Sequence, residues 1–420
     1  MSASDRPVVD FDHHSPQFAA EPERQLADLR SRCPIAWTER YGGFWMLTGY
    51  DAIAEVARDD YTFSSRHDVG DPDSPYKGTT IPQGPMLVAP VPVEIDPPEF
   101  IEWRRIVNPM FSPSAVAPYA PFIEEVVTAC LDAVIESGRI DFVLDLANPV
   151  PAIVILKILG LPLEEWERYA QPQHDLVAYK PGTSGSIAAG EGIAWTVDQL
   201  RLAIADRRAH PRPDDYITRL TQSTVDGRPV SDERILGHLT VALSGGVDTT
   251  TALFANVIHH LSAHPADRAR LIAEPGLIPQ ATEEFLRYFC PVTMMSRTVA
   301  KDTEVQGVQM REGERLMLAW AGANRDPAWF DRPDDLILDR FPNRHMTFGV
   351  GGHRCLGSNL ARLDFQILLR AVLERLPDFQ VDADRCERYP SRGVVNGFVR
   401  MPATFTPGSR RGSTFFLRGS

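Results

Sequence analysis

The side chain best suited to chemistry in this 420-residue chain is a cysteine placed among glycines. Glycines stand at positions 349, 351, 352 and 357 around Cys355, and apolar residues of segment 358–376 recur at helical spacing directly after it. A cysteine at the start of a helix feels the positive end of the helix dipole, which favours thiolate over thiol. Glycines also let a flat ligand approach the backbone closely. One thiolate offered to a planar metal cofactor is the arrangement of axial ligation to haem iron.

Taken alone, Cys355 has other interpretations. A lone cysteine is usually an inert, buried small side chain, and a glycine-rich loop before a helix can hold phosphate or simply turn the chain. A zinc site is disfavoured, because only His353 lies at ligand spacing from Cys355 and zinc needs four ligands.

A second group of reactive residues lies inside a long predicted helix, residues 231–261. Residues 242–250 read Ala-Leu-Ser-Gly-Gly-Val-Asp-Thr-Thr. Two adjacent glycines in a helix interior cost about 1 kcal/mol each relative to alanine, which suggests that the backbone opens there or is approached closely. A tight helix crossing is the alternative. Asp248 beside Thr249 could relay protons into an apolar pocket, which favours the first interpretation.

Residues 348–357 match every fixed position of the pattern Phe-Gly-x-Gly-x-His-x-Cys-x-Gly. This pattern resembles the haem-binding signature of the cytochrome P-450 family, the haem-thiolate monooxygenases, and recognisable family motifs run from position 96 to position 357. The resemblance implies that Cys355 is the axial ligand of the iron of haem b. Phe348, Gly349 and His353 would lie beside the cofactor in the same loop.

The segment around the glycine pair resembles the oxygen-binding helix motif of the same family, (Ala/Gly)-Gly-x-(Asp/Glu)-Thr. The resemblance implies that dioxygen lies in a groove at Gly245 and Gly246. Thr249 would steady it through its hydroxyl group, and Asp248 would help to deliver protons from solvent.

Three charged residues resemble the family's structural anchor. Glu284 and Arg287 are three residues apart, on one face of a predicted helix, although an isolated exposed pair would be worth little. In the family this pair is buried and tied to an arginine upstream of the cysteine, a position that Arg340 occupies here. The resemblance predicts a network of these three residues that holds the cysteine loop.

The two carboxylates of haem need cationic or donor side chains. By family position these are Arg104 and Arg297, with His353 as a further donor. Many members carry histidine four residues before the Arg104 position, whereas this chain has Phe100. Phe100 cannot donate a hydrogen bond, so one carboxylate would be held by another group or more loosely.

The remaining pattern predicts a mainly α protein with a minor β region, and the resemblance implies a single cytochrome P-450 domain over residues 1–420. We expect flexible ends at about residues 1–20 and 409–420. Residues 72–98 are rich in proline and glycine and read as a long loop. The expected helices are 101–110, 121–137, 151–159, 164–179, 191–209, 231–261, 280–289 and 358–376. The expected strands are 35–38, 44–48, 297–308, 313–318 and parts of 393–405.

Composition narrows the function further. The net charge of −13, from 43 basic and 56 acidic side chains, disfavours nucleic acid. Residues 1–14 lack the apolar core of a signal peptide, and we recognise no membrane span. Five scattered cysteines argue against a disulfide framework and for a reducing compartment. We therefore expect a cytoplasmic protein.

The resemblance implies a monooxygenase that hydroxylates or epoxidises a hydrophobic small molecule with O₂ and two electrons. The chain leaves no room for a fused flavin reductase, so a ferredoxin and an NAD(P)H-dependent ferredoxin reductase are the implied partners. Arg105, Arg344, Arg354 and Arg362 could together dock such an acidic donor.

Two alternatives remain. A peroxide-driven peroxygenase would not need the Asp248–Thr249 relay, and a non-catalytic haem sensor or carrier would need an output partner that the sequence does not show. The substrate class expected is terpenoid, steroid, fatty acid or polyketide-like. The residues expected by family position to line the substrate pocket are Val241, Ser244, Leu87, Val88, Val292, Met294, Met295 and Val395.

Overall fold

The computed structural model describes residues 6–83, 88–179 and 183–415. Its α-helices are α1 (Pro16–Ala20), α2 (Pro22–Arg32), α3 (Tyr50–Arg58), α4 (Glu99–Val107), α5 (Pro113–Val116), α6 (Ala120–Val134), α7 (Pro149–Leu159), α8 (Trp166–Ala178), α9 (Ser184–Ala209), α10 (Tyr216–Thr221), α11 (Asp232–Ala263), α12 (Pro265–Ala273), α13 (Ile278–Phe289), α14 (Trp320–Ala323) and α15 (Ser358–Arg375).

The strands are short and fall into several small sheets. They are β1 (Ile35–Thr38), β2 (Phe44–Leu47), β3 (Phe63–Ser64), β4 (Arg139–Asp141), β5 (Thr224–Val225), β6 (Arg228–Pro229), β7 (Met295–Val299), β8 (Thr303–Val305), β9 (Val308–Met310), β10 (Arg315–Leu318), β11 (Gln380–Val381), β12 (Glu387–Arg388), β13 (Phe398–Arg400) and β14 (Pro402–Thr404). The largest sheet has the order β1-β2-β10-β7-β3, and a three-stranded sheet has the order β11-β14-β4. The prediction of a mainly α protein with a minor β region is confirmed.

The five-stranded sheet joins the N-terminal hairpin to strands that come almost 250 residues later. β1 and β2 pair antiparallel, with Ile35 opposite Leu47, as the sequence predicted. β10 runs parallel to β2 and antiparallel to β7. The predicted strand at 297–308 is in fact β7 followed by a separate β8–β9 hairpin.

The long helix α11 has clear start and stop signals. The Ser231 hydroxyl accepts a hydrogen bond from the Arg234 N–H at 3.3 Å, and Asp232 and Glu233 occupy the first turn. Pro265 begins α12 two residues after α11 ends. The prediction of a helix over 231–261 is therefore confirmed, and the glycine pair does not interrupt it.

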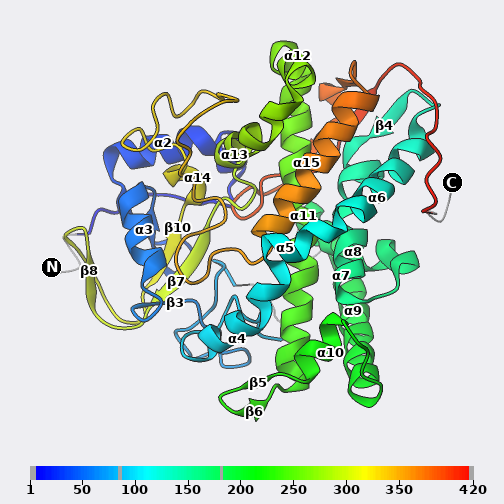
Figure 1. Ribbon diagram of the computed structural model, residues 1–420. Helices are drawn as coiled ribbons and strands as arrows, with labels where there is room; N and C mark the ends of the chain where they lie inside the picture. Colours follow the sequence, from blue (N-terminus) through cyan, green and yellow to red (C-terminus); the bar gives the residue numbers. More distant parts are fainter. Residues whose placement is uncertain (1–5, 84–87, 180–182, 416–420) are drawn as a thin grey trace.

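Figure 1 shows α11 running through the middle of the molecule, with α15 beside it, α6 to α9 on one side and the five-stranded sheet with α2 and α3 on the other. One apolar cluster fills the space between the helices and includes Phe254 and Phe365. A second cluster packs around the sheet and includes Trp45, Ile53 and Leu316. The helix α11 is therefore covered on most of its length.

Two helical stretches are long and apolar enough to cross a membrane by length and composition, namely Phe142–Leu159 and Asp232–Ala263. The first has a mean hydropathy of 1.9, but 83% of it is buried inside the protein, and 67% of the second is buried. Both stretches are accounted for as core helices, which are apolar because they pack on several sides.

The described chain ends make specific contacts with the rest of the protein. Phe18 on α1 is fully buried, and the Val9 N–H donates to the carbonyl of Trp37 on β1 at 2.8 Å. Near the other end, the Arg411 N–H donates to Asp132 at 3.0 Å. The described parts of 1–20 and 409–420 thus contact the body of the protein at these residues, while most side chains of 409–415 are exposed. Helix α9 also begins seven residues before its predicted start, because small residues that resemble a break continue the helix.

Candidate active site

The cysteine loop is held in one backbone conformation by close contacts. The Cys355 N–H donates to the Phe348 carbonyl at 2.8 Å, which closes the loop just before α15. Gly349 and Gly351 have φ angles of +68° and +78°, a region that side chains rarely adopt. A Cβ atom on Gly351 would lie 2.1 Å from the Ala57 carbonyl oxygen of α3. The glycines therefore serve loop geometry and close packing.

The loop presents Cys355 to a cavity of about 340 Å³. Phe348, Gly349, His353 and Cys355 line it together with the first turns of α15. Further lining residues come from the segment before α4, from α4 itself, from α7, from α11 and from the residues around β7. Helices and loops that are far apart in the sequence therefore line the cavity that contains Cys355.

The electrostatic environment of Cys355 is mixed. Burial raises the pKa of the Cys355 thiol, while the Gly357 N–H and the guanidinium groups of Arg104, Arg354 and Arg362 oppose that rise. The Gly357 N–H at the helix start and the three guanidinium groups therefore favour the thiolate, against the effect of burial. A metal ion that replaces the thiol proton would complete the stabilisation.

A face of α11 forms another wall of the cavity. Val241, Gly245, Gly246 and Thr249 all line it. A Cβ atom on Gly245 would meet nothing within 4 Å, whereas one on Gly246 would lie 3.3 Å from Ile155 of α7. Gly245 thus leaves open space in the cavity, and Gly246 permits a close helix crossing. Gly245 therefore fits the interpretation of an open backbone surface, and Gly246 fits the interpretation of a tight helix crossing.

Thr249 and Asp248 point in different directions. The Thr249 hydroxyl lines the cavity and donates to the Gly245 carbonyl at 2.8 Å. Asp248 is buried outside the cavity lining and lies 3.5 Å from the Nδ1 atom of His174 on α8. Successive residues of a helix are about 100° apart, so these two side chains point toward different neighbours. The structure therefore brings only Thr249 into the cavity.

Two cations line the same cavity without a carboxylate partner among the described residues. Arg297 is 4% exposed, and its side chain donates only to the Ser296 carbonyl, at 2.8 Å. Burial lowers the pKa of Arg297, although Asp60 and Asp96 nearby counteract this. Arg104 donates to the Arg354 carbonyl at 3.0 Å. A buried guanidinium group and a half-buried one, placed in this way, fit the acidic edge of a cofactor.

His353 and Phe100 form a stacked pair at this edge, with ring centroids 3.9 Å apart. The Nε2 atom of His353 lies 3.1 Å from the Ser65 hydroxyl. Burial, together with Arg297 and Arg104, holds the pKa of His353 well below its ordinary value. Phe100 therefore supports the His353 ring by stacking instead of donating a hydrogen bond.

The predicted anchor beside the cysteine loop is present. Arg287 and Glu284 are both fully buried and share two hydrogen bonds of 2.8 Å. The Nε atom of Arg340 donates to both Glu284 oxygens, at 3.1 and 3.0 Å. Two cations thus surround one carboxylate, and Arg340 extends the contact to the segment before the cysteine loop.

The residues expected to line a substrate pocket separate into two groups. Val241, Val292 and Met295 line the Cys355 cavity. Met294 is buried in the apolar cluster on the other side of the sheet, because neighbouring residues of an extended segment face opposite ways. The remaining expected residues lie outside the cavity lining or outside the described residues: Ser244 and Val395 are not among the lining residues, Val88 lines a different cavity, and Leu87 is outside the described part of the chain.

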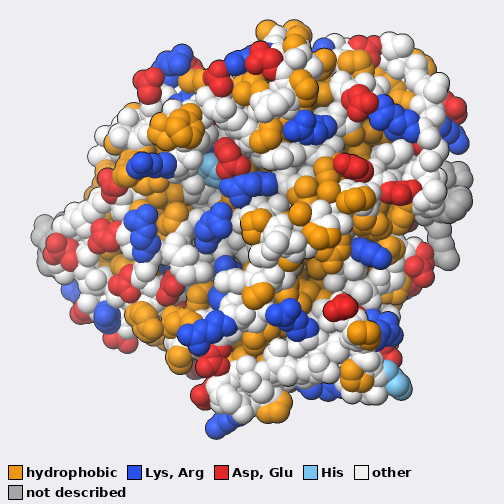
Figure 2. Space-filling view, in the orientation of Figure 1, with side chains coloured by type: hydrophobic (Ala, Val, Ile, Leu, Met, Phe, Trp, Pro, Cys, Tyr) orange, Lys and Arg blue, Asp and Glu red, His pale blue; other side chains and the backbone are white. Residues whose placement is uncertain are grey.

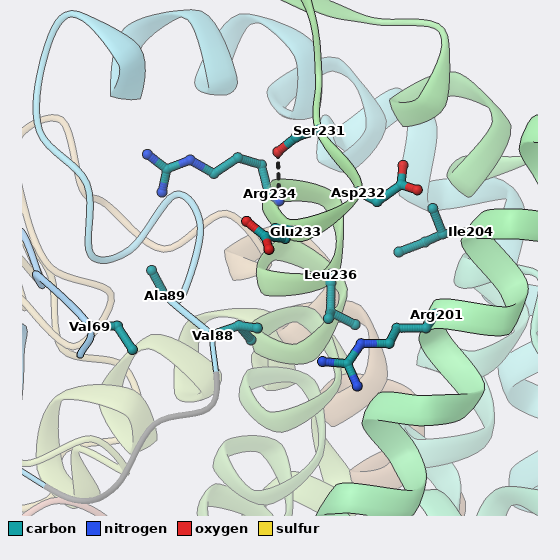
Figure 3. Close-up of a pocket in the computed structure, with 10 residues that line it drawn as sticks. All are labelled: Val69, Val88, Ala89, Arg201, Ile204, Ser231, Asp232, Glu233, Arg234 and Leu236. Atoms are coloured by element: carbon teal, nitrogen blue, oxygen red, sulfur yellow. Dashed lines mark hydrogen bonds between the residues drawn. The ribbon is translucent and has the colours of Figure 1, made fainter.

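A second cavity, of about 570 Å³, lies at the start of α11 (Figure 3). Arg201 extends across it from α9 toward Leu236 of α11, and Val88 faces it from the loop before α4. It contains no residue of the cysteine loop and many charged side chains. The chemistry predicted from the sequence therefore belongs to the smaller, more apolar cavity.

Comparison with known proteins identifies the family of this chain. The family model "Cytochrome P450" matches residues 196–405. The chain is 33% identical to the steroid C26-monooxygenase of Mycolicibacterium smegmatis, over 87% of this chain and 88% of that protein. It is 34% identical to the erythromycin C-12 hydroxylase of Saccharopolyspora erythraea, over 90% and 92%. The chain belongs to the cytochrome P450 family. This P450 is accordingly a haem-thiolate monooxygenase.

Solved structures confirm the fold. A mutant of P450 EryK in complex with erythromycin B has a TM-score of 0.82 and 30% identity, covering 96% of this chain and all of that one. CYP109E1 from Bacillus megaterium in complex with corticosterone has a TM-score of 0.79 and 29% identity, covering 93% and 100%. The predicted P450 fold is therefore confirmed.

Sequence reasoning missed several residues of the site. Ile155, Phe111 and Trp320 line the cavity, and His174 lies beside Asp248. None of these residues occupies a fixed position of a motif, so the sequence pattern did not indicate them. Only the general expectation of an apolar pocket covered them.

Proposed function

We propose that this P450 inserts one oxygen atom into a C–H bond or double bond of a hydrophobic small molecule in the cytoplasm. The observation that carries the proposal is the cavity, in which Cys355 and the bare Gly245 surface of α11 line one mostly apolar space. Residues 1–420 would act as one catalytic domain. The proposed cofactor is haem b, whose iron, when bound, accepts electrons and activates dioxygen.

The residues present fit that cofactor. Cys355 offers the sulfur ligand, and Arg104 and Arg297 offer guanidinium groups to the haem carboxylates. The mutual stacking of Phe100 and His353 supports the same edge. Among the described residues no group of three or more His, Cys, Asp or Glu side chains could hold a separate metal ion. A single thiolate ligand is therefore the one compatible with the donor set.

The α11 residues would control protons and water beside the cofactor. Thr249 keeps its hydroxyl proton on the Gly245 carbonyl, so its lone pairs remain able to accept a hydrogen bond in the cavity. Asp248, buried one residue earlier, would supply protons from the opposite side of the helix. The apolar walls formed by Val241, Val292 and Met295 would exclude bulk water.

The cavity supports a hydrophobic substrate of the terpenoid, steroid, fatty acid or polyketide class. Its two guanidinium groups are the ones assigned to the haem carboxylates, so the rest of the lining offers no strong cation for an acidic substrate. The names of relatives agree with this range, since one is a steroid C26-monooxygenase and another an erythromycin C-12 hydroxylase.

Electrons would come from a ferredoxin and its NAD(P)H-dependent reductase. Arg105, Arg344 and Arg354 are exposed near the cysteine loop, and Figure 2 shows Lys and Arg side chains gathered over the region between α3 and α15 of Figure 1. Arg362 does not belong with them as a free charge, because it pairs with Glu283. The basic surface suits an acidic donor.

A ligand screen followed by turnover tests the proposal. The reduced protein with carbon monoxide should show the red-shifted Soret band of thiolate ligation, and Cys355→Ala should abolish it. Testosterone, erythromycin B and palmitoleic acid represent three substrate classes, and a binder should shift the ferric spectrum to high spin. Turnover with a surrogate ferredoxin system should then give an oxygenated product. A protein that binds haem through imidazole, or that reduces oxygen without oxidising any binder, would refute it.

The Thr249→Ala variant tests the role of α11. It should retain the thiolate spectrum and divert reducing equivalents to hydrogen peroxide. The reason is that the variant lacks the hydroxyl that offers a hydrogen-bond acceptor and helps proton delivery in the cavity. Unchanged coupling of NADH use to product in this variant would contradict the role of Thr249.

A further inference from the structure

A buried histidine contacts the acidic residue of α11. His174 on α8 is 1% exposed, and Asp248 is 6% exposed. The Nδ1 atom of His174 lies 3.5 Å from Asp248 Oδ1 and 3.4 Å from the Tyr389 hydroxyl. Tyr389, just after β12, is itself 2% exposed. Three polar groups from separate elements are thus enclosed together, away from the Cys355 cavity.

The contacts determine which form of His174 fits. Its Nε2 atom lies 3.1 Å from the Val399 carbonyl of β13, and a carbonyl only accepts hydrogen bonds, so Nε2 carries a proton. A neutral His174 would then turn an unprotonated Nδ1 toward the Asp248 carboxylate, where both groups are acceptors. A protonated His174 turns an N–H toward the same carboxylate. The carboxylate at 3.5 Å therefore favours the imidazolium form, and the Tyr389 hydroxyl at 3.4 Å can donate to Nδ1 when the ring is neutral.

The charges around His174 act in the same sense. Burial lowers the pKa of His174, but Asp248, the Val399 carbonyl and Asp175 on the same helix outweigh this and raise it. Burial also holds the pKa of Tyr389 well above its ordinary value, so the phenol stays neutral. Asp248 Oδ1 is buried without a hydrogen-bond partner among the described residues, and Nδ1 of His174, at 3.5 Å, lies within ion-pair distance of it. The carboxylate thus depends on His174 for its compensation.

We propose that His174 is the positioning residue for proton delivery in this P450, holding the Asp248 carboxylate toward α8 and supplying it with a proton. In this step the proton leaves Nδ1 of His174 and binds Oδ1 of Asp248, which leaves a neutral imidazole and a neutral carboxylic acid. The Tyr389 hydroxyl then donates to the vacated Nδ1, and solvent restores the proton to His174. Because the pair joins α8 to α11, displacement of α8 interrupts the supply.

The proposal rests on the proposed monooxygenase function, and an assay without organic substrate tests it. Electrons from NADH through a surrogate ferredoxin system reduce oxygen either to peroxide or, with more protons and electrons, to water. His174→Gln should release at least about threefold more peroxide per oxygen than the wild type near pH 6.5. The wild-type peroxide fraction should rise as the pH rises above that value, whereas the variant should stay high and flat.

The matched control is His260→Gln. His260, near the end of α11, pairs with Asp267 of α12 at 2.8 Å, so the same substitution removes another histidine–aspartate contact. Its peroxide fraction should follow the wild-type pH profile. A His174→Gln protein with the wild-type profile, or a His260→Gln protein with the flat one, would overturn the proposal.

A stability measurement separates this inference from the proposed function. A histidine with a raised pKa stabilises the fold fully below its unfolded value near 6.5, and this contribution is lost as pH rises through the folded pKa. The decrease in Tm caused by His174→Gln should therefore become smaller as the pH rises. Asp248→Asn, in which His174 is still present, should remove the same pH-dependent contribution to the Tm. A pH-independent effect would overturn the His174–Asp248 pair even in a protein with normal turnover. Absence of oxygen turnover in the wild type would instead refute the proposed function.

Discussion

The buried anchor beside the cysteine loop gives a stability prediction that needs no substrate. The Glu284 carboxylate accepts two hydrogen bonds from Arg287 and contacts Arg340, Asn343 and the Ile337 N–H. Glu284→Gln keeps the size of the side chain and removes its charge. Two guanidinium groups, one of them fully buried, then lack a carboxylate.

Removing one partner of a buried ion pair costs about 3–5 kcal/mol, because the remaining charge stays away from water. Unfolding entropies near 2.1 cal/mol/K per residue give roughly 0.9 kcal/mol/K for a chain of this length. We therefore expect Glu284→Gln to lower the Tm by about 3–6 °C. Since Arg340 also bonds to the Asp331 and Asp335 carbonyls ahead of the cysteine loop, the thiolate-ligated fraction should fall too.

The neighbouring residue provides the control. Glu283 also pairs with an arginine, Arg362, but its carboxylate is 31% exposed, so water compensates for the loss of charge. Against the effect of burial, hydrogen bonds from Arg362 and His345 lower the pKa of Glu283 to about 2, so Glu283→Gln should also lower the Tm, but by less than Glu284→Gln because water reaches its carboxylate. Thermal unfolding followed by circular dichroism, with the reduced carbon monoxide spectrum, measures both effects. Equal Tm values for the two variants would refute the argument that burial makes the Glu284 carboxylate essential.

Three further predictions concern single positions. Gly351→Ala should destabilise the protein by about 2 kcal/mol or more and reduce the thiolate spectrum, because the residue has a positive φ and its Cβ would overlap a backbone oxygen, whereas Gly357→Ala should be tolerated in denaturant titrations. Met294→Ala should cost about 2–5 kcal/mol as a core truncation, while Met295→Ala should chiefly alter ligand affinity in the spectral titration. Burial lowers the pKa of His238 to about 4, so its neutral form stabilises the fold above pH 6.5 and this contribution is lost as pH falls toward 4. His238→Gln should therefore reduce the loss of unfolding free energy between pH 6.5 and pH 4 by up to about 3 kcal/mol. An unchanged pH dependence of stability over this range would contradict the assignment.

Local signals in the sequence predicted the parts of the site that lie close together in the chain. The capping serine and acidic first turn placed α11, and the spacing of glycines and Cys355 placed the cysteine loop. The contact between Glu284 and Arg287 followed from helical periodicity. Arg340 followed from resemblance alone, since no local pattern relates residues 56 positions apart.

The remaining features depend on tertiary packing. The direction of Met294 and Met295 depends on which face of the sheet meets the helices, and a short segment does not encode that choice. His174 and Asp248 are 74 residues apart, and their contact arises only when α8 crosses α11. The sequence also predicted one relay that contains both Asp248 and Thr249. In the structure Thr249 faces the Cys355 cavity, whereas Asp248 faces His174 on α8.

That divergence on α11 limits how this P450 can change during evolution. Gly245 and Thr249 serve the cavity, Gly246 fits against α7, and Asp248 faces α8, all within one helical turn and a half. Inserting or deleting one residue upstream would rotate this set by about 100° and shift it by about 1.5 Å. All three neighbours would lose their partners at once. Substitutions can therefore accumulate along α11, but length changes are confined to the connections at its two ends.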